Sequence, residues 1–300
     1  MTEELYESWT ARQESALYER RGGVRRRQAG AGPKPELDFC DRVMLTVVHL
    51  RTGLTHAALA EMYAVGRSTV SDAIGQIRPL LATRGFSVPE RPGLRLRTLA
   101  DVFAYAEAEN IDLRLDGTEV QVRRPRPGKP GRKQFVSGKK KQNTCKTTTI
   151  CDGSGRMLWS GADRPGRMHD QTAMRTEGIA EQLRLHPEVH VEADSGYQGL
   201  AKEFPGQVTV PPPKPDKDAP QGEQLAHREY RRRQSSRRIC VEHVIGETKK
   251  WRPLQRYTGR RETYPETHAA IASLVSDRTA LRPTRHRTST ELVLVRDTVC

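Results

Sequence analysis

Three acidic residues, Asp116, Asp194 and Glu242, are the side chains of this chain best suited to chemistry. Each aspartate follows a short stretch in which apolar and polar residues alternate, which is the pattern of a half-buried strand. A glycine follows each aspartate within two residues. We therefore predict that both aspartates end a strand just before a glycine-containing turn. Glu242 lies in a stretch that predicts one long helix.

The chemistry of this set depends on whether the three carboxylates meet. At the rim of one sheet they would repel one another unless cations neutralised them. Oxygen ligands with open positions favour Mg²⁺ or Mn²⁺ over zinc. Two such ions about 4 Å apart can activate a water molecule and stabilise the oxygen that leaves when the water attacks a phosphodiester. Each residue alone has a simpler interpretation, because Asp-Gly is a common turn pair and Glu242 could pair with Arg238. Their joint placement favours the metal site.

The composition indicates a nucleic-acid partner. The 300 residues include 51 Lys and Arg against 37 Asp and Glu, a net charge of +14. Aromatic residues make up only 5%, which leaves few platforms for stacking on single-stranded bases, so a duplex nucleic acid is the expected partner. Apolar residues, at 35%, suffice for a folded core.

Membrane and secretory classes are not expected. The best apolar run, Val43 to Leu50, is far shorter than the roughly 18 residues that a spanning helix needs. The first residues lack a secretory pattern, and the five cysteines are scattered without a CxxC motif. We expect a cytoplasmic protein without membrane contact that associates with the nucleoid when it is bound to DNA.

The chain divides into five predicted segments. They are a basic N-terminal arm of weak order (1–38), a helix-turn-helix DNA-binding domain (39–95), a connecting helix (96–110), a mixed α/β domain (111–282) and a polar tail (283–300). Within the α/β domain we expect strands at 111–116, 144–151, 156–161 and 189–194, helices at about 170–183 and 224–251, and a loop at 205–220.

The first domain has the pattern of a helix-turn-helix. Apolar spacings of three and four residues predict three short helices between 39 and 81, with a break at 64–68 where Ser68 could cap the last helix. That helix would turn a polar set outward, able to meet a major groove: Arg67, Thr69, Ser71, Asp72 and Gln76. The alternative is a structural three-helix module whose polar face is solvated.

A basic stretch follows the first predicted strand. Residues 123–146 hold ten basic residues and no acid, punctuated by prolines. The stretch could follow DNA phosphates, or it could be a solvated run of charge. The predicted DNA contacts in it are Arg123, Arg124, Lys139, Lys140 and Lys141.

Two further groups of polar residues lie near the acidic set in the predicted fold. His169 and Asp170 open a helix, where Asp170 could cap it or approach the metal site and His169 could touch a phosphate or its neighbours' carboxylates. In the helix at 224–251, Arg238, Glu242 and Lys249 lie together beside the apolar arc that would pack on the sheet.

These motifs together resemble the DDE transposases of bacterial insertion sequences, the group related to eukaryotic Harbinger elements. The likeness covers about 111–251 and rests on four ordered motifs: Leu115-Asp116-Gly117-Thr118, Gly166 to Asp170, Asp194-Ser195-Gly196-Tyr197, and Arg238-x3-Glu242-x6-Lys249. It implies an RNase H-like catalytic domain, preceded by the small all-α helix-turn-helix domain. It also implies metal-dependent cleavage and joining of DNA strands, with terminal inverted repeats and target DNA as partners of a homo-oligomer.

The resemblance implies a role for individual residues. Asp116, Asp194 and Glu242 would be the catalytic triad and would hold two Mg²⁺ or Mn²⁺ ions, with His169, Asp170, Arg238 and Lys249 in support. One position departs from the pattern, because Ser235 stands where the family often has a tyrosine. The second hypothesis is an inactive or domesticated DNA-binding derivative of such a transposase. A basic structural protein of RNA or the ribosome is a third, but it leaves the triad unexplained.

Overall fold

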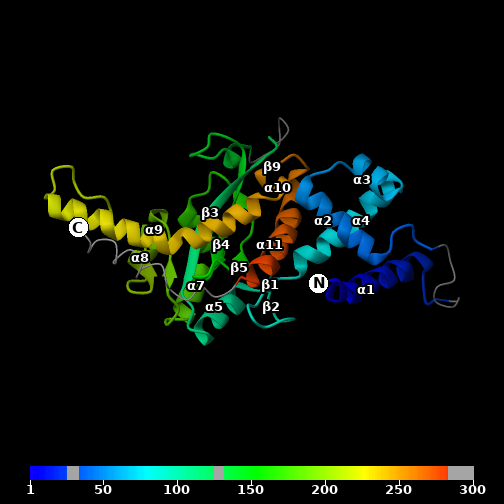
Figure 1. Cartoon of the computed structure of the whole chain (residues 1–300), viewed down its shortest axis with the longest axis horizontal. Coiled ribbons are helices and arrows are strands. Elements are labelled where there is room, and N and C mark those ends of the chain that lie inside the picture. Colours follow the sequence, from blue (N-terminus) through cyan, green and yellow to red (C-terminus); the bar gives the residue numbers. More distant parts are fainter. Residues whose placement is uncertain (26–33, 125–131, 283–300) are drawn as a thin grey trace, which may run out of the picture.

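A computed structural model shows a helical N-terminal part joined to a mixed α/β part (Figure 1). It describes residues 1–25, 34–124 and 132–282. The predicted tail at 283–300 lies outside this range, as does the 125–131 portion of the basic stretch. Along the described ranges, no helix combines the length and the apolar character needed to cross a membrane.

The N-terminal part is built from helices. Their bounds are Thr2–Arg21 (α1), Phe39–Thr52 (α2), His56–Tyr63 (α3) and Arg67–Thr83 (α4). The two-residue strands Phe86–Ser87 (β1) and Arg95–Leu96 (β2) lead to Leu99–Ala108 (α5), which packs on the α/β part. The helix-turn-helix is confirmed, and its turn uses Ala64 in the left-handed conformation with a φ of 52°. The predicted cap is wrong, because Gly66 is the N-cap of α4 and Ser68 lies inside the first turn.

The expected weak order near the N-terminus is also wrong for α1. Leu5 is buried, and the Trp9 ring packs 5.1 Å from that of Phe39, so one side of α1 covers the first residues of α2. Arg20 and Arg21, two of the arginines that indicate a loose arm, lie in the last turn of α1, where their charges interact favourably with the negative end of the helix dipole.

The α/β part is a mixed sheet with helices on both faces, as the RNase H-like expectation requires. Its strands are Leu113–Val122 (β3), Thr144–Cys151 (β4), Met157–Ser160 (β5), Arg164–Pro165 (β6), Val191–Glu192 (β7), Val208–Thr209 (β8) and Arg256–Tyr257 (β9). The order is β5-β4-β3-β7-β8, with β6 paired to β4 and β9 to β3. β4 and β5 run antiparallel to their neighbours, whereas β7, β8 and β9 pair in parallel.

The helices of this part are Asp170–Thr176 (α6), Ile179–Leu185 (α7), Gln198–Glu203 (α8), Gln221–Lys249 (α9), Arg252–Gln255 (α10) and Tyr264–Ala280 (α11). Three expectations need correction. The helix predicted at 170–183 is two helices, separated at Gly178, whose φ of 85° suits glycine. The loop predicted at 205–220 contains β8. Asp116 does not end its strand, because β3 continues to Val122.

The face of β3 that is buried changes midway along the strand. Leu113 and Leu115 are buried in its first half, whereas Thr118, Val120 and Val122 are buried in its second half. The pairing with β4 runs without a register shift, so side chains alternate regularly and the buried face switches between Leu115 and Thr118. Asp116 and Gly117 therefore stand where neither face is fully covered.

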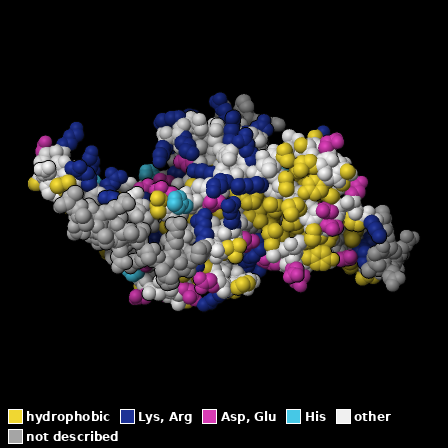
Figure 2. All heavy atoms as spheres, in the orientation of Figure 1, with side chains coloured by type: hydrophobic (Ala, Val, Ile, Leu, Met, Phe, Trp, Pro, Cys, Tyr) yellow, Lys and Arg dark blue, Asp and Glu magenta, His cyan; other side chains and the backbone are white. Residues whose placement is uncertain are grey.

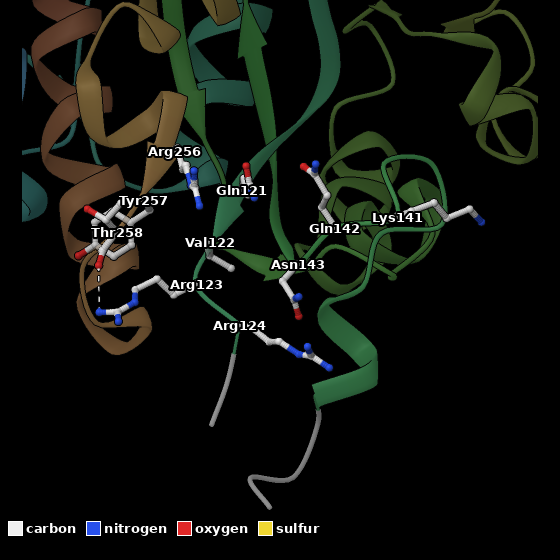
Figure 3. A pocket seen from close by; sticks show the side chains of 10 residues that line it. All are labelled: Gln121, Val122, Arg123, Arg124, Lys141, Gln142, Asn143, Arg256, Tyr257 and Thr258. Atoms are coloured by element: carbon white, nitrogen blue, oxygen red, sulfur yellow. Dashed lines mark hydrogen bonds between the residues drawn. The ribbon is translucent and has the colours of Figure 1, made fainter. Parts of the chain in front are cut away.

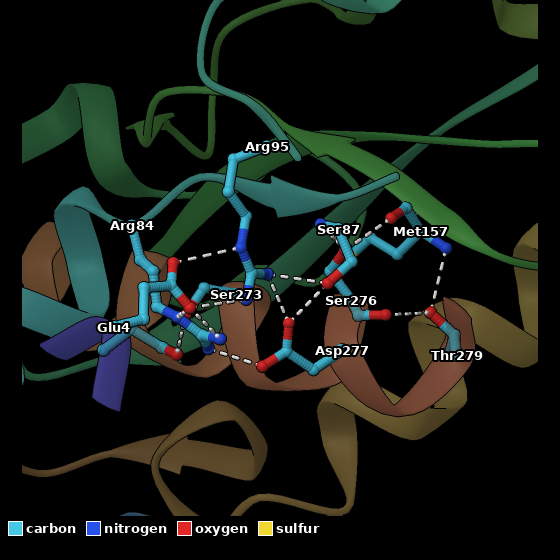
Figure 4. Close-up of polar contacts among 10 residues, drawn as sticks. Glu4, Arg84, Ser87, Arg95, Met157, Ser273, Ser276, Asp277 and Thr279 are labelled. Atoms are coloured by element: carbon cyan, nitrogen blue, oxygen red, sulfur yellow. Dashed lines mark hydrogen bonds and ion pairs between the residues drawn. The ribbon is translucent and has the colours of Figure 1, made fainter. Parts of the chain in front are cut away.

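A buried arginine joins the two parts (Figure 4). Arg84, at the end of α4, has a side chain only 3% exposed; its Nη2 donates to Glu4 Oε2 of α1 at 2.7 Å, and its Nη1 to Asp277 of α11. Arg95 of β2 binds the same two carboxylates. These contacts fix α1 and the helix-turn-helix against the last helix of the α/β part.

Arg84→Met should lower the free energy of unfolding by about 2–3 kcal/mol, because it leaves Asp277 and Glu4 with one cation fewer. The cost stays below that of a fully buried pair because Arg95 remains. The matched control is Arg91→Met, which breaks an exposed pair with Glu109 and should cost less than about 1 kcal/mol. Urea unfolding of both variants checks this, and equal costs would contradict the role assigned to Arg84.

Candidate active site

Parallel pairing of β3 with β7 brings the two aspartates together. Leu113 of β3 pairs with Val191 of β7. Asp116 lies three residues after Leu113, and Asp194 lies three residues after Val191. Asp116 Oδ1 accepts a hydrogen bond from the Gly117 amide at 2.7 Å. Asp194 caps the turn after β7, where its Oδ1 accepts from the Ser195 amide and hydroxyl.

Arg238 of α9 connects these carboxylates. Its Nη2 lies 3.2 Å from Asp116 Oδ2 and its Nη1 lies 3.7 Å from Asp194 Oδ1. The guanidinium is buried because α9 packs through Val241 and Val244, which lie on the same side of the helix. Glu242 is exposed at the margin of that packed face. The helix therefore brings one cation and one further carboxylate to the two aspartates.

The three carboxylates line one cavity of about 560 Å³. The rest of its lining is polar or proline-rich and comes from the turn after β7, the start of α8, the chain before α9, and α9 itself: Ser195, Gln198, Pro211, Pro212, Pro213, Lys214, His227, Arg231, Gln234, Ser235 and Arg238. Gln234 is 5% exposed, and neither polar atom of its amide has a partner among the described residues. A buried amide without partners is costly, so the cavity is suited to a polar ligand.

Electrostatics couple the members of this site. Burial raises the pKa of Asp116, the charges of Asp194 and Glu242 raise it further, and Arg238 opposes them. Lys249, half-buried in α9, has its pKa lowered by burial and by the charge of Lys140, while Asp116 acts in the opposite direction. The surroundings therefore disfavour the ionised form of Asp116, and Arg238 offsets only part of that cost.

The donor set suits a hard divalent cation, since every acidic group of the cavity offers carboxylate oxygens. Within the described ranges, no three His, Cys, Asp or Glu side chains are already grouped tightly enough to hold a metal. Arg238 supplies positive charge between Asp116 and Asp194 instead.

Asp170 occupies the other face of β3. A Cβ at Gly117 would lie 3.5 Å from Asp170 Oδ1, and side chains alternate along a strand, so Asp116 points away from Asp170. Asp170 pairs with Lys146 Nζ at 2.6 Å. It does not cap α6 as expected, because His169 is the N-cap. His169 itself is exposed and lies outside the lining of the cavity.

The residues predicted to contact DNA lie in two places. On α4, Arg67 and Ser71 are exposed, and Thr69 donates to Glu36 Oε2 at 2.9 Å. The expectation that Gln76 points outward is wrong, because its Oε1 accepts from Trp9 Nε1 of α1 at 3.0 Å. The others are all exposed and lie around the β3–β4 connection: Arg123, Arg124, Lys139, Lys140 and Lys141.

Sequence reasoning missed several members of the site. Arg231, Gln234 and Ser235 line the cavity on the stripe that leads to Arg238 and Glu242, at spacings of three and four residues. That helical spacing was a signal that could have found them. His227 lies four residues before Arg231 in α9 and carries the same signal. Gln198, at the start of α8, and Lys214, in the chain between β8 and α9, carry no comparable signal.

Comparison with known proteins gives two family matches. Residues 115–276 match the profile described as DDE superfamily endonuclease, and residues 35–87 match the helix-turn-helix of DDE superfamily endonuclease. The comparison with curated proteins finds no match.

Among solved structures, the chain is similar to the piggyBac transposase in a synaptic complex with hairpin DNA. The identity is 12%, the match covers 97% of this chain and 75% of that chain, and the TM-score is 0.43. It is also similar to the Mos1 mariner paired-end complex with Mn, at 14% identity, 89% and 86% coverage and a TM-score of 0.21.

The segment that carries His169 and Asp170 is held by a close approach at Gly166. A Cβ there would stand 1.8 Å from Thr144 Oγ1 and 2.8 Å from the Thr144 carbonyl oxygen. Gly166→Ala should therefore lower the free energy of unfolding by about 1–3 kcal/mol through overpacking. Gly138→Ala is the control, since a Cβ there meets nothing within 4 Å. Chemical unfolding compares the two, and a Gly166→Ala protein as stable as the control would contradict the contact.

Proposed function

Because this chain belongs to the DDE superfamily of endonucleases, we propose that it is a transposase that cleaves DNA and joins the strands at the ends of a mobile element. The observation that carries this proposal is the convergence of Asp116, Asp194 and Glu242 on one cavity. The mobile element would be a bacterial insertion sequence of the group related to Harbinger elements, as the motifs in the sequence suggest.

The two parts of the chain would have different functions, one in binding the ends of the element and the other in cleaving the DNA. The exposed polar residues of α4 would bind the terminal inverted repeats, with Arg67 and Ser71 the freest to reach base edges. The cavity of the α/β part would receive the scissile phosphate. Assembly on DNA would involve more than one copy of the chain, which would bring both ends of the element together.

Asp116, Asp194 and Glu242 would hold two Mg²⁺ or Mn²⁺ ions. When bound, such ions activate an attacking oxygen, first of water and then of a DNA 3′-hydroxyl, and stabilise the leaving oxygen. The chain's own part is to hold the carboxylates in place: the Gly117 amide fixes Asp116, the Ser195 amide fixes Asp194, and Arg238 limits their repulsion.

The other side of the cavity would bind the DNA strand. Lys214 and Arg231 supply positive charge for the phosphates next to the scissile bond, and the Gln234 amide has free hydrogen-bonding capacity for the same backbone. These groups would orient the phosphodiester toward the carboxylates without reading its sequence.

Asp116→Asn should reduce cleavage of end-containing DNA by at least about 100-fold in Mg²⁺ or Mn²⁺, because it removes an anionic ligand while keeping the shape of the side chain. Its affinity for the DNA should stay within about twofold of the parent's. Asp112→Asn, an exposed position close by on the chain, is the control and should cleave normally. Gel assays of cleavage and binding test both.

Cleavage by Asp116→Asn at the parent's rate would contradict the triad. A parent that binds the ends but cleaves neither strand under any metal condition would favour the inactive DNA-binding derivative.

A further inference from the structure

A second cavity lies beyond the carboxylates, at the far end of β3 (Figure 3). It has a volume of about 780 Å³ and is formed by the last residues of β3, the turn before β4, and β9: Gln121, Val122, Arg123, Arg124, Lys141, Gln142, Asn143, Arg256, Tyr257 and Thr258. β3 lies between the other two strands there, because Val122 pairs with Tyr257 and Gln121 with Thr144. We refer to this cavity as the basic pocket.

The basic pocket carries positive charge with no compensating carboxylate. Its charged lining residues are Arg123, Arg124, Lys141 and Arg256, all exposed. None of the four forms an ion pair with another residue in the described part of the chain, whereas buried arginines such as Arg84 do. Arg123 is held in place by a hydrogen bond from its Nη1 to the Thr258 carbonyl at 3.4 Å. Concentrated, unneutralised cations attract an anionic ligand.

We propose that the basic pocket binds backbone phosphates of the same duplex DNA whose scissile phosphate enters the carboxylate cavity. This inference rests on the proposed function and adds to it a second site, distant from the scissile phosphate, that binds the DNA backbone.

Spacing and charge continuity favour this ligand. Asp116 and Val122 are six residues apart on β3, which is about 20 Å of strand, or about six nucleotide steps of DNA. Lys140 lies between, with its Nζ bound to the Glu119 carbonyl at 3.0 Å, and Lys249 is close enough to interact with both Lys140 and Asp116. Figure 2 shows Lys and Arg side chains gathered over the region where Figure 1 draws the end of β3 and β9.

The pocket is suited to the backbone rather than to bases. Its one aromatic lining residue, Tyr257, is 7% exposed, with its hydroxyl bound to Thr263 Oγ1 at 2.6 Å and its ring packed on Tyr264. It therefore offers no face on which a base could stack, as sites for single strands do.

The test is the double variant Arg124→Gln, Arg256→Gln, with Arg175→Gln, Arg184→Gln as a control of equal charge change whose arginines pair with Glu203 outside the pocket. DNA binding is measured by fluorescence anisotropy at several salt concentrations, on end-containing and on random duplexes. The pocket variant should bind both duplexes at least about tenfold more weakly, with the log–log salt slope reduced by about 1.8 for two lost phosphate contacts. The control should keep the parent's slope.

A second measurement locates the contact without altering the protein. Single methylphosphonates, which remove one phosphate charge, are placed along the end-containing duplex. The parent should lose affinity from substitutions about six nucleotides from the cleavage site, and the pocket variant should be insensitive to those same substitutions.

The outcomes separate the two proposals. If the parent binds and cleaves DNA but the pocket variant retains its salt slope, or if the methylphosphonate effect is equal in parent and variant, the basic pocket is not a phosphate site and the proposed function stands. If the parent binds no DNA at any salt concentration, the proposed function and the pocket both fail.

Discussion

The guanidinium of Arg238, lying between Asp116 and Asp194, is the interaction on which the rest of the site depends. Burial and two neighbouring carboxylates already raise the pKa of Asp116, so the pair needs a nearby cation to remain ionised. Arg238 can supply it only because α9 packs its apolar side on the sheet and β7 pairs in parallel with β3. The long helix and the short strand thus both serve to assemble charges that would otherwise repel.

β3 separates the Asp116 carboxylate from the Asp170 carboxylate. Gly117 follows Asp116, and Asp170 lies close to it on the opposite face, bound to Lys146. A side chain at Gly117 would press on the Tyr197 hydroxyl at 3.3 Å. Asp170 also lies beside the turn that holds Asp194, because a Cβ at Gly196 would stand 3.5 Å from Asp170 Oδ2. Asp170 therefore contacts the backbone next to both aspartates. β3 then continues to the basic pocket, so one element spans both proposed contacts with DNA.

Local pattern predicted much of this architecture. The strand at Thr144–Cys151 is found as expected, and the helix-turn-helix and the long helix lie close to their predicted bounds. The alternation stops at Asp116, which predicts a strand end there. In the structure the buried face of β3 switches at this point, and helices distant in sequence, α9 and α10, contact the strand. The helical pattern predicts Gln76 at the surface, because nothing in the local sequence indicates that Trp9 of α1 donates a hydrogen bond to it. The two-residue strand β8 is too short to leave a pattern.

We propose that Asp116, Asp194 and Glu242 form one cation site from which Asp170 is excluded. Isothermal titration with Mn²⁺ tests it directly on Asp116→Asn, Asp194→Asn, Glu242→Gln and Asp170→Asn. The account predicts that each of the first three lowers the affinity for Mn²⁺ by about tenfold or more, because each removes an oxygen ligand, while Asp170→Asn binds as the parent does. It would be contradicted if any of the three kept the parent's affinity, or if Asp170→Asn lost as much as they do.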